Sequence, residues 1–136
     1  MKLDLTQLES AFLLALDTLE NQDLLDFMKV RWSRALEKAK GKLIEQPYFA
    51  WQLDKLTLLS IPNRKKAETC CRFYQANDKT CHRLDKLGYC QAFYEGFPCW
   101  HRAAFLLLGI YFGFAIEIRF EKAQEKSVSV KNVNQS

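Results

Sequence analysis

The chain has 136 residues, of which 49% are hydrophobic and 26% charged, and its formal net charge is +4. This is the composition of a globular protein and excludes an intrinsically disordered or low-complexity chain. The length fits a single domain, 1–136, which can bury a core without the help of disulfides.

The start of the chain lacks the pattern of a secretory signal. It reads Met1-Lys2-Leu3-Asp4, and acidic residues flank the apolar stretch 11–16, whereas a signal peptide carries basic residues first and small residues after its apolar core. We therefore expect a cytoplasmic protein, in which the five cysteines are thiols or metal ligands rather than disulfides.

The segment 6–60 predicts three helices. Thr6-Gln7-Leu8-Glu9 matches a capping box that begins the first helix, and a break at 21–23 separates this helix from a second one at 24–39. Pro47 suits the first turn of a third helix. The inward residues expected on the second and third helices are Leu24, Phe27, Met28, Ala35, Leu36, Tyr48, Trp51, Leu56 and Leu59.

The segment 64–102 has a different character. It contains all five cysteines and both histidines, and its eight basic and four acidic residues carry the whole net charge of +4. Short helical pieces are predicted at 68–75 and at 81–87, with Gly88 ending the second.

Pro98 predicts the start of a long final helix, 99–126, followed by a polar tail at 127–136 that we expect to fray. Its apolar run 103–116 would rise about 21 Å as a helix, which is shorter than the roughly 30 Å hydrocarbon core of a membrane. We therefore expect no transmembrane segment. The predicted fold is all-α: a small irregular helical bundle with the cysteine-rich segment packed at one end of a long apolar C-terminal helix.

Four cysteines, Cys71, Cys81, Cys90 and Cys99, follow one another at steps of ten, nine and nine residues. Four thiolates can bind a zinc ion or a [4Fe–4S] cluster, and the positive charge of the segment favours the thiolate form. We predict that these four residues bind a metal. The alternates are Cys70, His82 and His101, which rank lower because each stands within two residues of a predicted ligand.

The identity of the metal stays open. No two of these cysteines form the short C-x-x-C loop that is common in zinc sites, which favours a cluster, while the simplicity of a single ion favours zinc. Buried metal-free thiols are the third alternative. The order Cys-x9-Cys-x8-Cys followed by Cys99-Trp100-His101 loosely resembles CCCH-type zinc fingers. The last gaps in that family are much shorter, so no residue role is taken from it.

Basic residues alternate with aromatic ones in the same segment, a pattern that is compatible with contact with a nucleic acid or with a protein partner. The preferred interpretation is a solvated surface above the metal site, with the aromatic rings buried as its hydrophobic shell. The residues predicted to contact a nucleic acid are Arg64, Lys65, Lys66, Arg72 and Arg83.

Motifs of enzymes are scarce. The sequence has no glycine-rich phosphate loop, no G-x-S-x-G and no H-E-x-x-H. It therefore predicts a small metal-binding protein, zinc or iron–sulfur, with a non-enzymatic binding or regulatory role. An iron–sulfur redox protein is one alternative. The other is a metal-free helical interaction module, associated with a membrane through 103–116.

Overall fold

The computed structural model describes residues 2–45, 48–60, 72–84, 88–114 and 120. In chain order these form α1 (Leu5–Glu20), α2 (Asp26–Glu45), β1 (Phe49–Trp51), β2 (Leu56–Ser60), β3 (Arg72–Ala76), β4 (Cys81–Arg83), β5 (Gly88–Tyr89), α3 (Gln91–Tyr94) and α4 (Trp100–Tyr111). The five strands make one antiparallel sheet in sequence order. The prediction of an all-α bundle is therefore wrong, and the fold combines helices with a sheet.

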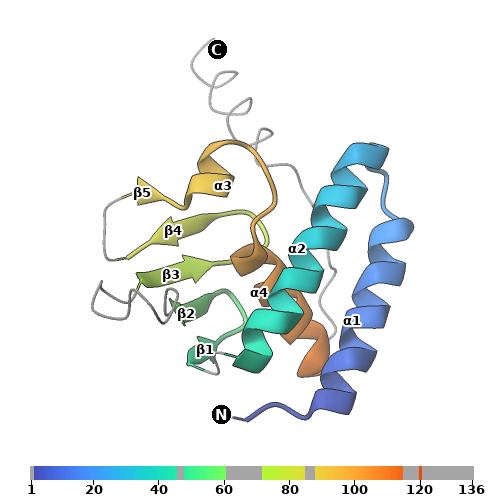
Figure 1. Cartoon of the computed structure of the whole chain (residues 1–136), viewed down its shortest axis with the longest axis horizontal. Coiled ribbons are helices and arrows are strands. Elements are labelled where there is room, and N and C mark those ends of the chain that lie inside the picture. Colours follow the sequence, from blue (N-terminus) through green and yellow to red (C-terminus); the bar gives the residue numbers. More distant parts are fainter. Residues whose placement is uncertain (1, 46–47, 61–71, 85–87, 115–119, 121–136) are drawn as a thin grey trace.

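Three layers stack against one another, with α4 in the middle (Figure 1). One side of α4 packs on α1 and α2, and its other side contacts β2 and β3. This central place explains why α4 is buried almost all round, from His101 to Gly109. An apolar helix of this kind is expected inside a fold rather than on its surface.

The two N-terminal helices were predicted correctly as helices, but their ends differ. The carboxylate of Asp4, not the hydroxyl of Thr6, caps α1 by accepting a hydrogen bond from the Gln7 N–H at 3.0 Å. Helix α2 begins at Asp26 and continues past Gly41 to Glu45. Phe27, which was expected to face inward, is 54% exposed, whereas Met28 beside it is buried.

The helix predicted after Pro47 is wrong, because a hairpin of β1 and β2 occupies this part of the chain. Leu56 and Leu58 are buried while Thr57 between them is not, which is the two-residue period of a strand. Their partners across the sheet are Ala76 and Tyr74 of β3. Spacing of apolar residues at three, five and three positions fits a hairpin as well as a helix.

The cysteine-rich segment is also not helical where short helices were expected. Strand β3 covers all of the described part of 68–75, and β4 covers the first three residues of 81–87. Residues 61–71 and 85–87 lie outside the described residues. Ala76 pairs with Cys81 across the β3–β4 hairpin. Because alternate strand residues face opposite sides, this register directs Cys81 to the same face as Leu56 and toward α4.

The final helix is much shorter than predicted. Helix α4 covers 12 residues and ends at Tyr111, and Gly113 follows with a φ of 74°, a left-handed conformation that glycine adopts readily. The predicted tail 127–136 lies outside the described residues. No helix in the described part of the chain is long and apolar enough to cross a membrane.

Candidate metal centre

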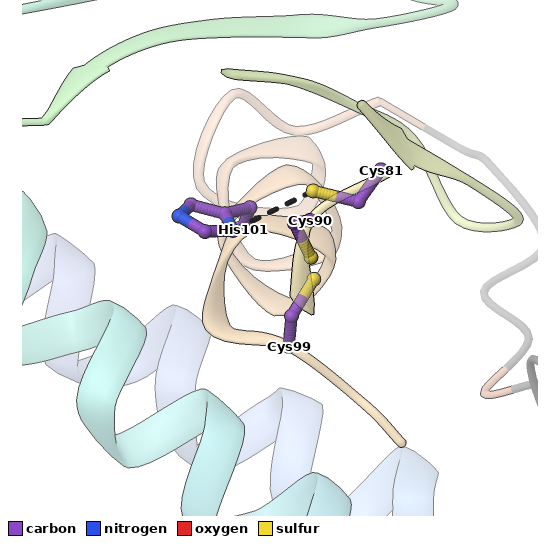
Figure 2. A group of neighbouring side chains, drawn as sticks. All are labelled: Cys81, Cys90, Cys99 and His101. Carbon is purple, nitrogen blue, oxygen red and sulfur yellow. Dashed lines mark hydrogen bonds between the residues drawn. The ribbon is translucent and has the colours of Figure 1, made fainter. Parts of the chain in front are cut away.

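Four buried side chains meet where the sheet approaches the start of α4 (Figure 2). They are Cys81 of β4, Cys90 just before α3, Cys99 just before α4, and His101 in the first turn of α4. The three sulfur atoms and one ring nitrogen all lie within 4.8 Å of one another. Thiolates and imidazole are the ligands of many protein metal sites, so this Cys3His group could hold a metal ion.

Two of the cysteines are N-caps. The Cys90 sulfur accepts a hydrogen bond from the Phe93 N–H, and the Cys99 sulfur accepts one from the Arg102 N–H, each at 3.4 Å. Free N–H groups at a helix start stabilise a negative charge, and α4 adds the field of its dipole. The Cys90 N–H also donates to the Cys81 carbonyl at 3.1 Å, which holds two of the ligand backbones together.

His101 takes part because of the backbone of Cys99. The sequence ranked His101 below the cysteines, on the assumption that both residues are helical and therefore point apart. Cys99 is instead an extended N-cap, with φ −109° and ψ 158°, and His101 is the second residue of the helix. The His101 Nδ1 thus comes to 3.5 Å from the Cys81 sulfur, which Figure 2 shows as a dashed line.

Aromatic rings fix the orientation of the His101 ring. Tyr74 stacks on it with 3.8 Å between ring centres and 20° between planes, and the Trp100 ring lies at 4.3 Å. Burial lowers the pKa of His101 below its usual value, so the imidazole is neutral near pH 7. The neutral ring is the form that binds metals.

The three cysteine side chains shift one another's pKa values. Hydrogen bonds from Cys81 and Cys99 hold the pKa of Cys90 far below its ordinary value, so Cys90 is a thiolate near pH 7. The hydrogen bonds with Cys90 and with Cys99, together with burial, raise the pKa of Cys81. Burial raises the pKa of Cys99 to about 12. These opposite shifts favour a thiolate at Cys90 and thiols at Cys81 and Cys99 in the metal-free group.

The structure brings together three of the predicted ligands with one of the alternates. Cys71 and the alternate Cys70 lie outside the described residues. His82 follows Cys81 on β4 and therefore faces the opposite side of the sheet, where its ring lies 4.9 Å from that of Tyr89. It is not part of the Cys3His group.

The predicted nucleic-acid contacts are only partly described. Arg64, Lys65 and Lys66 lie outside the described residues. Arg72 is the first residue of β3 and pairs with Ser60, while Arg83 ends β4 opposite Tyr74. No sequence pattern assigned a role to Arg102, whose backbone N–H contacts the Cys99 sulfur. Its only signal in the sequence is its place three residues after a cysteine at a predicted helix start.

No protein-family model, no curated protein and no solved structure matches this chain.

Proposed function

We propose that the protein is a small, non-enzymatic zinc-binding protein, in which Cys81, Cys90, Cys99 and His101 hold one Zn²⁺ ion as a structural cross-link. The observation that carries this proposal is the distance of at most 4.8 Å between any two of the four ligand atoms. Cys3His is one of the usual ligand sets of structural zinc.

The spacing of the ligands supports a single ion over an iron–sulfur cluster. A tetrahedral zinc with Zn–S bonds of about 2.3 Å separates its sulfur ligands by about 3.8 Å. In a cluster each thiolate binds a different iron, so two Fe–S bonds and an Fe–Fe separation stand between neighbouring thiolates. Ligands already within 4.8 Å of one another would have to move apart to hold a cluster, but only slightly inward to hold zinc.

Burial supports a structural role for the ion. All four ligands are buried, and four protein ligands fill a tetrahedral shell, so no position is left for a substrate or a reactive water. The ion would tie β4 to the starts of α3 and α4. A reducing compartment such as the cytoplasm suits three ligands that must stay reduced.

The metal content of purified variants tests the proposal. Cys90→Ser and His101→Asn are expected to lose zinc, because each removes one of four ligands. Two matched variants serve as controls: His82→Asn removes the other histidine, on the opposite side of the sheet, and Cys71→Ser removes a cysteine that is not among the four proposed ligands. Zinc retained in His101→Asn, or lost in Cys71→Ser, would contradict the ligand set.

The partner that we propose for this protein is a nucleic acid. The support is the charge of +4 between residues 64 and 102 and three exposed rings among the described residues of that segment, Phe73, Tyr89 and Tyr94. Phe73 and Tyr89 are 44% and 46% exposed, and exposed rings can stack on unpaired bases while basic side chains bind phosphates.

Binding to a fluorescent single-stranded oligonucleotide tests this partner. Binding should weaken with added salt, and replacing Arg64, Lys65 and Lys66 together by Ala should reduce the slope of that dependence. The control is a triple alanine variant in α2, at Lys38, Lys40 and Lys42, which removes the same number of positive charges from another part of the protein. Absence of binding at low salt, or equal effects of the two triple variants, would favour a protein partner instead.

A further inference from the structure

Arg102 places a positive charge deep inside the protein and directly follows His101 of the Cys3His group in α4. Its side chain is fully buried, and its Nη2 donates a hydrogen bond to the Asp78 carbonyl at 2.6 Å. The guanidinium carbon lies 4.9 Å from the centre of the Trp32 ring and 5.5 Å from that of Phe93. Arg102 therefore joins α4 to α2, to α3 and to the turn between β3 and β4.

A buried cation is costly unless opposite charges lie close to it. Burial lowers the pKa of Arg102, whereas the thiolate forms of Cys99, Cys81 and Cys90 and the carboxylate of Asp78 act in the opposite direction. Three of these four groups are the sulfur ligands of the proposed zinc site. The contact of the Arg102 N–H with the Cys99 sulfur fixes this neighbourhood through the backbone as well.

The charges of the occupied site explain why such a residue stands there. A zinc ion with three thiolates and a neutral imidazole carries a net charge of −1, since two positive charges meet three negative ones. The guanidinium of Arg102 brings this sum to zero within the buried region. A Cys2His2 site is already neutral without any such residue.

We propose that Arg102 is the counter-ion of the metal centre and that it favours a three-thiolate ligand set over a two-thiolate one. This inference rests on the proposed zinc site. Arg102 touches no metal; it is a positioning and charge-compensating residue that acts through the ligands. Residues outside a metal's own ligands commonly change metal affinity 10- to 100-fold.

A double-mutant comparison separates this charge effect from packing. Zinc affinity of the full chain is measured by competition with a chromophoric chelator for the native sequence, Arg102→Met and Arg102→Lys. The Arg102→Met change is then repeated in a Cys90→His chain, whose zinc centre would be neutral. Arg31→Met is the matched control, because Arg31 also lies over a ring, that of Phe97 at 4.0 Å, but on the exposed side of α2.

We expect Arg102→Met to weaken zinc binding 10- to 100-fold in the native ligand set, and to cause little or no loss in the Cys90→His chain. Arg102→Lys should recover most of the loss, and Arg31→Met should leave the affinity unchanged. An equal loss in both ligand sets would overturn the proposal, because a packing role does not depend on the number of thiolates.

Two further outcomes are also decisive. If Cys90→His binds no zinc, the comparison is made in the native ligand set alone. Zinc affinity that is retained in Arg102→Lys but lost in Arg102→Met supports the counter-ion role, and equal losses in the two variants overturn it. If the native chain itself binds no zinc, the zinc site is refuted, whereas a native chain that binds zinc with Arg102→Met unchanged refutes only the counter-ion.

Discussion

Removal of the metal should loosen one edge of the protein and leave the helical pair intact. The proposed zinc ligation at Cys81, Cys90 and Cys99 would close two consecutive loops, 81–90 and 90–99, of ten residues each. By the chain-entropy relation for cross-links, a loop of ten residues contributes about 2.7 kcal/mol at 25 °C. The two loops together contribute roughly 5 kcal/mol, which equals the low end of the stability of a whole domain, about 5–15 kcal/mol.

Hydrogen exchange followed by mass spectrometry, with and without a chelator, measures this effect by segment. Amides of β3, β4 and α3 should exchange faster in the metal-free protein, by up to about four orders of magnitude for a loss of this size. Amides of α1 and α2 should change little, because these helices pack on each other and on α4 through residues such as Leu8, Trp32 and Leu36.

Two results would contradict a zinc cross-link that stabilises the sheet and α3 but not α1 and α2. Exchange that is the same with and without the chelator would mean that no ion cross-links the segment. Equal acceleration in α1 and α2 would mean that the ion supports the whole core rather than the edge formed by the sheet and α3. The Cys90→Ser variant should reproduce the pattern of the chelated protein, and Cys71→Ser should not.

Three other predictions follow from the same contacts. Zinc binding near pH 7 should release about two protons, from Cys81 and Cys99, because the lowered pKa of Cys90 already makes it a thiolate. Zinc affinity should therefore rise with pH. Calorimetry in buffers of different ionisation enthalpy counts the released protons, and a count of three would contradict this assignment. Asp4→Ala should destabilise the protein by about 1 kcal/mol in urea unfolding through loss of the α1 cap, and no change would refute the capping role. Leu108→Ala should cost about 2–5 kcal/mol while zinc content stays unchanged, because Leu108 is fully buried in the core.

Local signals predicted the N-terminal helices but not the sheet. The stretches 5–20 and 26–45 carry strong helical periodicity, and packing did not override it. In 49–60 the spacing of apolar residues is compatible with both the helical period and the two-residue period of a strand. The pairing of Leu56 with Ala76 of β3 stabilises the strand. That pairing joins residues 20 positions apart, so no short window of sequence contains it.

The sequence also pointed to only part of the candidate site, because the rest depends on backbone conformation and on contacts between distant residues. Clustering of cysteines in 70–99 identified Cys81, Cys90 and Cys99, which the fold brings together. The place of His101 in this group depends on an N-cap conformation at Cys99, a detail that the sequence alone does not specify. The role of Arg102 depends on burial against Trp32, a residue 70 positions earlier in the chain, and no local pattern reports such a contact.

X-ray absorption spectroscopy at the metal edge of protein purified without oxygen decides whether the Cys3His group holds zinc, because it reports the element and its ligands together. We expect zinc with three sulfur neighbours at about 2.3 Å and one nitrogen at about 2.0 Å. Iron with a second iron close by, four sulfur ligands around zinc, or protein without stoichiometric metal would contradict it.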